Sequence, residues 1–183
     1  GSSNAASILK GLIKLYDLNI PLNDLLKIGS SIGADVPFFI QGGCQIGSGI
    51  GNQLVKIDHA IKNTFLLVMP GIHIGTKTTF KKFKKILDCN KEKVNFADFI
   101  EKDKFLFKFF ENDFETIIVP AYPEIGQIKK TLLEQGAVYS SLSGTGSTVF
   151  GGFDDEAKAI SAESLFNLRY KTVIAHPVKR IVR

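Results

Sequence analysis

One carboxylate in this chain has surroundings that suit a proton-accepting base. Asp35 lies between Gly33, which permits a sharp turn, and Pro37, which biases the residue before it toward extended backbone. Residues 36–40 form a short apolar run that is typical of a buried strand. A carboxylate at such a corner is well placed to accept a proton from a substrate. The alternative is that Asp35 caps a helix or closes an Asx turn, as Asp beside Gly commonly does.

A second candidate site lies at the start of the chain. Apolar residues at positions 5, 8, 9, 12, 13 and 16 follow helical spacing, so Ser2 or Ser3 stands at a helix N-terminus. Backbone N–H groups and the positive end of the helix dipole make such a terminus a natural phosphate site. A hydroxyl at that position, from Ser2 or Ser3, can also ligate the Mg²⁺ that accompanies a nucleotide. An ordinary serine N-cap is the alternative.

A third candidate is a loop of small residues between two apolar segments. The sequence Ser-Leu-Ser-Gly-Thr-Gly-Ser-Thr occupies residues 141–148, with Gly144, Thr145 and Gly146 at its centre. Glycine lets the backbone approach an anionic group closely, because no Cβ intervenes. A hairpin turn needs the same residues, so the loop alone does not separate anion binding from a structural role.

The elements around Asp35 and Ser2 are short. The pattern predicts one helix over residues 3–17 and, after Pro21, a second helix that ends near Gly29. Short strands are expected over residues 36–40, 44–46 and 54–57. Polar residues interrupt the apolar pattern at residues 58–63, where we expect a domain boundary.

The second part of the chain predicts a four-stranded sheet with helices. Strands are expected over residues 64–69, 138–142, 148–153 and 171–175. Helices are expected over residues 76–87, 122–135 and from a cap at Asp154 or Asp155 to about Phe166, and residues 90–118 are expected to be helical. The helix at 122–135 should end before Gly136 and bury Ile125, Ile128, Leu132 and Leu133. Helices on one face of four strands predict an α+β fold of ferredoxin-like type.

Composition limits the function classes. The chain has 183 residues, 44% of them hydrophobic, and no apolar run long enough to cross a bilayer. Cys44 and Cys89 lack the spacing of metal ligands and suggest a reducing compartment. The net charge is +5, and its densest cluster is Lys77, Lys81, Lys82, Lys84 and Lys85. This cluster is either solvated helix surface or an attractor for an anionic, diphosphate-bearing substrate.

Together, the motifs resemble those of the GHMP kinase superfamily, which includes galactokinase, homoserine kinase, mevalonate kinase and phosphomevalonate kinase. Within it they are most similar to the kinases that act on 4-diphosphocytidyl-2-C-methyl-D-erythritol. The matching segments are Gly-Ser-Ser-Asn-Ala-Ala at 1–6, Gly-Ala-Asp-Val-Pro-Phe-Phe at 33–39, Met-Pro-Gly at 69–71 with Thr76 and Phe80, Asn-Asp-Phe-Glu at 112–115 and Tyr-Pro-Glu at 122–124. One departure is Gly-Ile-Gly-Asn at residues 49–52, where the family usually has Gly-Arg-Gly-Glu.

The resemblance implies a two-domain fold. Residues 1–58 would be the remainder of a nucleotide-binding N-terminal domain, of the type called ribosomal-protein-S5-domain-2-like. Residues 64–183 would be a ferredoxin-like C-terminal domain. The family places roughly a third of its enzyme before this sequence begins, including a lysine partner for Asp35. We therefore expect the 183 residues to be inactive as a kinase by themselves.

The resemblance also implies a reaction and its residues. ATP with Mg²⁺ would phosphorylate the 2-hydroxyl of a small-molecule substrate that carries cytidine diphosphate, in the cytoplasm of a bacterium or in a plastid stroma. Asp35 would be the catalytic base. Phosphates would be held by Gly1, Ser2, Ser3, Gly144, Thr145 and Gly146, with Ser2 on Mg²⁺. Phe80 would stack on the cytosine ring beside Lys81, unless Phe80 belongs to the core.

Two other functions remain as alternatives. One is another small-molecule kinase of the same superfamily, acting on homoserine, mevalonate or a sugar. The other is an RNA-binding module, because a ferredoxin-like sheet and basic charge suit one. Such a module needs paired aromatic residues in a signature on a central strand, and this chain has no such run, so we expect no nucleic-acid partner.

Overall fold

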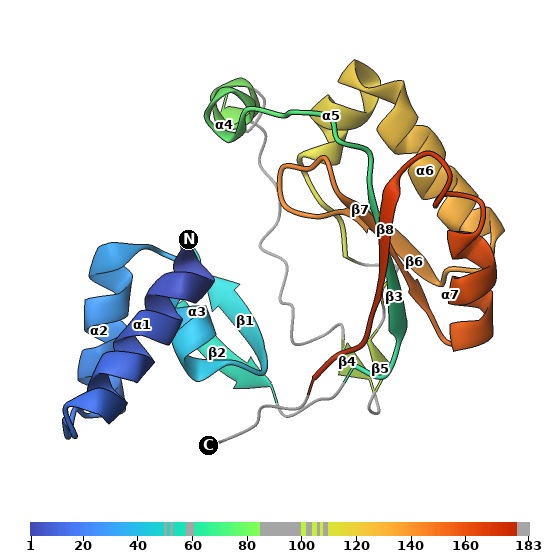
Figure 1. Cartoon of the computed structure of the whole chain (residues 1–183). Coiled ribbons are helices and arrows are strands. Elements are labelled where there is room, and N and C mark those ends of the chain that lie inside the picture. The colour runs from blue at the N-terminus through green and yellow to red at the C-terminus, as the bar shows by residue number, and fades with distance from the viewer. Residues whose placement is uncertain are drawn as a thin grey trace. The chain divides into compact units, whose positions relative to one another are not determined.

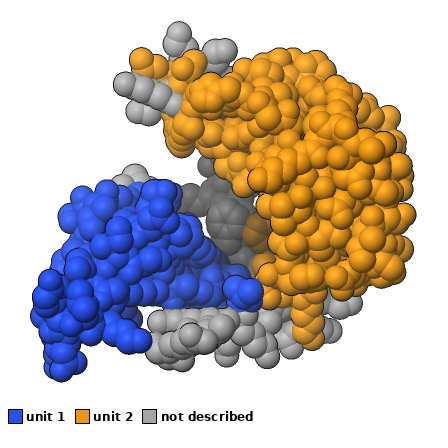
Figure 2. Space-filling view, in the orientation of Figure 1, with its two compact units in different colours: residues 1–60, 178–183 blue, residues 61–177 orange. Residues whose placement is uncertain are grey.

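The computed structural model describes residues 1–49, 51, 53–57, 61–84, 100–101, 104–105, 107 and 110–178. The chain divides into two compact units, which Figure 2 colours separately. Unit 1 contains residues 1–60 and 178–183, and unit 2 contains residues 61–177. Several residues named above lie outside the described residues. They are positions 50 and 52 in the Gly-Ile-Gly-Asn segment, Lys85, Cys89 and most of residues 90–109.

Unit 1 is built from three helices and a hairpin (Figure 1): α1 (Ser2–Leu15), α2 (Leu22–Ile32), α3 (Val36–Gln41), β1 (Cys44–Ser48) and β2 (Gln53–Ile57). Its small core joins one or two residues from each helix, namely Ala6, Leu25, Val36 and Ile40. Gly29 lets α2 approach α3 closely, because a Cβ there would lie 2.7 Å from Cδ1 of Ile40. The strands β1 and β2 pair antiparallel.

The prediction of a strand over residues 36–40 is wrong, because these residues belong to helix α3. Pro37 lies in the first turn, where a helix needs no backbone N–H from it, so it starts the helix rather than extending the chain. A short apolar run cannot be assigned to strand or helix by periodicity alone. Helix α2 also continues past Gly29 to Ile32, and Gly33 is extended, with φ −179°, rather than left-handed.

Unit 2 contains the four-stranded sheet that the sequence predicts. Its strands are β3 (Thr64–Met69), β6 (Tyr139–Leu142), β7 (Val149–Phe153) and β8 (Lys171–Ala175). They are ordered β6-β7-β3-β8 and every neighbouring pair is antiparallel. Helices α6 (Pro123–Glu134) and α7 (Glu156–Glu163) cover one face (Figure 1). The connection order and sheet order are those of a ferredoxin-like α+β fold, which confirms the predicted fold class.

The core of unit 2 lies between this sheet and its helices. Alternate residues of β3 are buried, including Leu66 and Val68, and they pack with Ile125, Ile128, Leu132, Ala159 and Ala162 from the two helices. Leu133 was expected to join them, but it is 47% exposed. It lies one residue, or about 100°, around the helix from Leu132 and therefore faces away from the sheet.

The described part of residues 90–118 is not the helix that its composition suggests. Strands β4 (Ile100–Glu101) and β5 (Lys104–Phe105) form a short antiparallel hairpin, and helix α5 (Glu115–Ala121) begins only at the end of the segment. Helix α4 (Thr76–Lys84) corresponds to the expected basic helix. Asp155, rather than Asp154, caps α7, because its side chain accepts the Ala157 N–H at 2.9 Å.

Candidate functional site

In unit 1, three segments meet around Asp35. The start of α1 approaches the α2–α3 junction, since a Cβ built on Gly33 would lie 4.0 Å from the Ser2 hydroxyl oxygen. The β1–β2 turn approaches from another side, and a Cβ on Gly51 would lie 4.0 Å from Oδ1 of Asp35. The structure therefore places Ser2 near Gly33, two residues before Asp35, although 31 positions separate Ser2 from Gly33 in the sequence.

The Asp35 carboxylate is exposed and its backbone is well held. Val36 and Pro37, the next two residues, are buried, and the Val36 N–H donates to the Gly33 carbonyl at 3.1 Å. Asp35 occupies the N-cap position of α3, yet its side chain makes no capping hydrogen bond within the described structure. The capping alternative therefore does not account for this side chain, and the carboxylate stays available to a ligand.

The start of α1 differs from an ordinary serine cap. Gly1 is the N-cap and Ser2 is the first helical residue, and the described residues supply no side-chain cap. The Ala5 N–H bonds to the Gly1 carbonyl at 3.0 Å, so the helix is regular from its first turn. A terminus of this kind presents N–H groups that a phosphate oxygen can accept from.

In unit 2, residues 143–148 form a tight loop between β6 and β7, here called the glycine loop. The Ser143 N–H donates to the Thr148 carbonyl at 2.8 Å, and the Gly146 N–H donates to the Ser143 carbonyl at 2.9 Å. Gly144 and Gly146 both have left-handed backbone, with φ +57° and +87°. A Cβ on Gly144 would meet no described atom within 4 Å, whereas one on Gly146 would lie 2.9 Å from Cδ1 of Leu142.

Two residues that sequence reasoning did not assign to the site hold this loop in place. The Asn112 amide nitrogen donates to the carbonyls of Leu142 and Gly144, at 2.8 Å each. The Glu115 carboxylate accepts the Leu142 N–H at 2.7 Å and the Ser141 hydroxyl at 3.0 Å, and it pairs with Lys129. The Asn-Asp-Phe-Glu motif was visible in the sequence, but its contact with a loop 30 residues away was not.

The aromatic candidate Phe80 lies on α4 and is 48% exposed, so it is not a core residue. Its ring meets the Phe114 ring edge to face, with centroids 4.9 Å apart. Lys81 beside it is exposed. From the same helix, the Thr76 hydroxyl lies 3.4 Å from the Thr145 hydroxyl of the glycine loop. Unit 2 therefore brings the start of α4 to the glycine loop.

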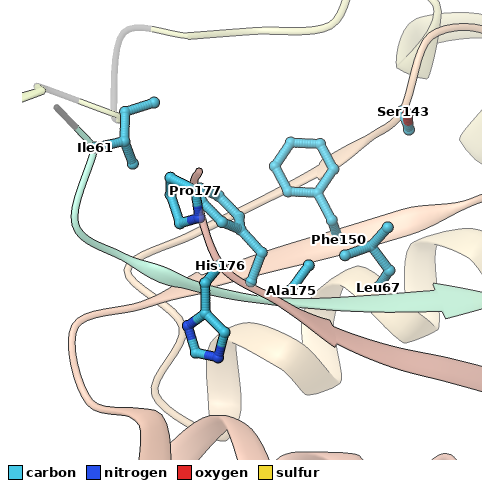
Figure 3. A pocket seen from close by; sticks show the side chains of 8 residues that line it. Ile61, Leu67, Ser143, Phe150, Ala175, His176 and Pro177 are labelled. Carbon is cyan, nitrogen blue, oxygen red and sulfur yellow. The ribbon is translucent and has the colours of Figure 1, made fainter. Parts of the chain in front are cut away.

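A separate apolar pocket opens on the sheet face opposite α6 and α7. It has a volume of about 340 Å³ and is lined by Ile61, Phe65, Leu67, Ser143, Phe150, Ala175, His176 and Pro177 (Figure 3). Ser143 is its one lining residue from the glycine loop. The predicted site residues do not line this pocket.

The described residues contain no group of three or more His, Cys, Asp or Glu side chains that could hold a metal ion. Partial burial raises the pKa of the Cys44 thiol, which lowers its reactivity as a thiolate. In the part of the chain that the structure describes, no helix is both long enough and apolar enough to span a membrane.

The predicted residues thus divide between the units. Ser2 and Asp35 belong to unit 1, while Phe80, Lys81 and the glycine loop belong to unit 2. Within unit 1 the structure brings Ser2 close to Gly33, two residues before Asp35, and within unit 2 it brings α4 to the glycine loop through Thr76.

Comparison with known proteins finds a matching family model and sequence relatives that share one name. Residues 93–170 match the family model described as GHMP kinases C terminal. Two relatives named 4-diphosphocytidyl-2-C-methyl-D-erythritol kinase come from Geobacter sulfurreducens, 36% identical over 92% of this chain and 60% of its own length, and from Alkaliphilus oremlandii, 38% identical over 93% of this chain and 60% of its own length. The chain therefore spans about 60% of the length of these curated relatives.

Solved structures show the same fold. A crystal structure of 4-(cytidine 5'-diphospho)-2C-methyl-D-erythritol kinase superposes with a TM-score of 0.75 at 22% identity, covering 94% of this chain and 63% of that one. Mevalonate kinase from Staphylococcus aureus gives a TM-score of 0.62 at 16% identity, covering 96% of this chain and 65% of that one. Residues 93–170 are thus similar to the C-terminal part of GHMP kinases, and the chain shares the fold of these solved kinases.

Proposed function

We propose that the protein carrying this chain transfers the γ-phosphoryl group of ATP to the 2-hydroxyl of 4-diphosphocytidyl-2-C-methyl-D-erythritol. The observation that carries the proposal is the exposed Asp35 carboxylate, which makes no capping hydrogen bond and follows the Gly33 turn that lies near Ser2 of α1. The names of the sequence relatives support this acceptor over homoserine, mevalonate or a sugar.

In this reaction Asp35 accepts or orients the proton of the attacking hydroxyl. Phosphoryl transfer is catalysed mainly by positioning and by stabilising the charge on the transferred group. The N–H groups at the start of α1, with Ser2 and Ser3, bind phosphate oxygens in unit 1. Backbone N–H groups of the glycine loop do so in unit 2. Phe80 stacks on the cytosine ring, and Lys81 adds positive charge beside it.

Mg²⁺ fits the donor set of unit 1. The ion prefers oxygen ligands and is usually bound through one or two protein groups together with substrate phosphates and waters. The Ser2 hydroxyl, close to the Gly33–Asp35 turn, is the ligand that unit 1 offers. When bound, Mg²⁺ neutralises charge on the β- and γ-phosphates.

The test uses Asp35→Asn in the complete natural protein, because this change keeps the side-chain shape and removes its basicity. We expect turnover at saturating substrates to fall 10²–10⁴-fold, roughly 3–5 kcal/mol of barrier, without a change in melting temperature. Asp17→Asn, another exposed carboxylate of unit 1, is the control and should retain activity. Near-normal turnover by Asp35→Asn would exclude the base role.

A panel of acceptors tests the substrate. Steady-state turnover is compared for 4-diphosphocytidyl-2-C-methyl-D-erythritol, homoserine, mevalonate and galactose at equal ATP. The first should exceed the others in kcat/KM. A preference for any other acceptor would assign the protein to another branch of the family, and filter binding to single-stranded RNA tests the remaining alternative.

A further inference from the structure

One side chain, that of Asn112, binds the glycine loop at two peptide units, 142–143 and 144–145, which are separated by one unit. The two Asn112 amide hydrogens are directed at the carbonyls of Leu142 and Gly144, and its oxygen accepts the Phe114 N–H at 3.0 Å. One carboxamide thus uses both donors and its acceptor within one small region. A clamp of this kind fixes the orientation of the two peptide planes as well as their position.

That orientation decides where the loop N–H groups point. In a trans peptide the C=O and the N–H of the next residue face opposite ways. Because Asn112 binds the Leu142 carbonyl, the Ser143 N–H faces away and bonds to Thr148. By the same geometry, binding of the Gly144 carbonyl turns the Thr145 N–H to the side away from Asn112. The carbonyl oxygens of Leu142 and Gly144, which would repel a phosphate, therefore point toward Asn112. The Thr145 N–H points to the opposite side, where it can donate to a phosphate oxygen.

Glu115 fixes the end of the strand that leads into the loop. β6 is at the edge of the sheet that the described strands form, and Glu115 accepts the N–H of its last residue, Leu142. The pair that Glu115 forms with Lys129 is mostly buried, with exposed side-chain fractions of 18% and 20%. A buried ion pair that also accepts two hydrogen bonds holds its geometry firmly, because breaking it leaves a charge without a partner.

We propose that Asn112 and Glu115 are positioning residues that orient the glycine loop for phosphate binding. The proposal rests on the proposed function, since it assumes that the glycine loop contacts ATP. Phosphoryl transfer is sensitive to such orientation, and a misplacement of about 1 Å can cost 10²-fold in rate.

The decisive variant is Asn112→Asp in the complete natural protein. Asp keeps the acceptor for the Phe114 N–H but has no donor for the two loop carbonyls. We expect kcat/KM for ATP to fall about 10- to 100-fold, while KM for the cytidine substrate changes less than about twofold. Asn167→Asp, the same change at an exposed position after α7, should leave both constants unchanged. If Asn112→Asp does not fold, Asn112→Ser, which keeps one donor, takes its place.

A second measurement does not depend on activity. Hydrogen exchange of the peptide covering residues 142–148 should be faster in Asn112→Asp and in Glu115→Ala than in the wild type. Glu115→Gln should restore slower exchange, because its amide oxygen can still accept the Leu142 N–H. Exchange in α7 serves as the internal reference.

The outcomes separate the two proposals. If the wild type phosphorylates none of the acceptors, the proposed function fails, and loop exchange still reports whether the clamp exists. If the wild type is active and Asn112→Asp keeps its kcat/KM for ATP, the positioning role is excluded. A fall in melting temperature with unchanged ATP kinetics would assign Asn112 a purely structural role and overturn the proposal.

Discussion

At the scale of single residues, the two glycines of the loop have similar backbone and different surroundings. Gly146 is packed against Leu142 and Ile74, so a side chain there would displace core atoms. Gly144 opens onto space in which no described atom lies within 4 Å. The left-handed backbone alone would penalise any side chain by about 1–2 kcal/mol at either position. Only Gly144 therefore has room for a ligand where a Cβ would be.

The first residue-scale prediction concerns Gly144→Ala. The added methyl group should obstruct a bound phosphate, so KM for ATP rises or kcat falls, with a stability loss of about 1–2 kcal/mol. Gly43→Ala is the matched control, because Gly43 also has positive φ, +81°, and open surroundings. Kinetics and thermal melts of both variants decide the matter. Equal, unchanged kinetics in the two would show that the Gly144 position does not face a ligand.

The second residue-scale prediction concerns Phe80→Leu. If Phe80 stacks on the cytosine ring, Phe80→Leu loses a stacking free energy of about 1–3 kcal/mol. The KM for the cytidine substrate should then rise about 5- to 150-fold. Stability should change little, because the ring is 48% exposed. Phe65→Leu is the comparison: Phe65 is half-buried in β3 and packs against Phe150, so its loss should lower stability and leave KM alone. The reverse pattern would make Phe80 a packing residue.

Residue types and spacing indicate Asp35, Ser2 and the glycine loop as candidates from the sequence, because each candidate needs only a local pattern; their roles stay predictions. The sequence did not indicate Asn112 and Glu115 as site residues, because their hydrogen-bond partners are 30 and 27 positions away. An Asn three residues before a Glu near a helix start also has an ordinary local explanation in capping. Only the folded chain shows that the Asn112 amide donates its hydrogen bonds to a loop that is distant in the sequence. The clamp is a tertiary contact without a local sequence signal.

At the scale of elements, strong periodicity predicted structure well and short apolar runs did not. β3 and β8 have the bounds that the sequence predicted, and α6 buries three of its four expected residues. α3 was mistaken for a strand because six apolar-rich residues carry no readable period. The hairpin of β4 and β5 lies in a segment where Phe and Lys alternate irregularly, so neither helix nor strand spacing was evident.

The element-scale prediction concerns the cap of α7. Asp155→Ala removes the acceptor for the Ala157 N–H and should lower the free energy of unfolding by about 1 kcal/mol. Asp154→Ala removes the exposed hydrogen bond that the Asp154 carboxylate accepts from the Asn63 side chain and should lower the free energy of unfolding by less. Urea denaturation of both variants makes the comparison. A larger loss from Asp154→Ala would mean that the Asn63 contact, and not the cap, secures this end of the helix.

At the scale of the whole molecule, the apolar core is unevenly divided. Unit 2 has a continuous core between its sheet and helices, whereas the buried cluster of unit 1 contains four of the described residues. The helices α1 and α2 expose large apolar side chains at Ile8, Leu12, Leu15, Leu22, Ile28 and Ile32. Small units bury too little surface to be stable alone, so most of the intrinsic stability belongs to unit 2.

The whole-molecule prediction follows from this division. Residues 61–177 expressed alone should give a cooperative urea transition and the circular dichroism of a mixed α+β protein. Residues 1–60 alone should show no cooperative transition. A gradual, non-cooperative transition for residues 61–177 would indicate that unit 2 depends on unit 1 for its fold.

The strand order of unit 2 also has a consequence for protein synthesis. Among the described strands, β3 pairs with β7 and β8, and both are made much later in the chain. Leu66 and Val68 are fully buried in the folded unit. When they leave the ribosome, β7 and β8, with which β3 pairs, have not yet been synthesised. At about 5–20 residues per second, roughly 5–20 s pass before residue 175 is made. During that interval an apolar strand is open to association with other chains, and we expect nascent unit 2 to depend on a chaperone that shields β3.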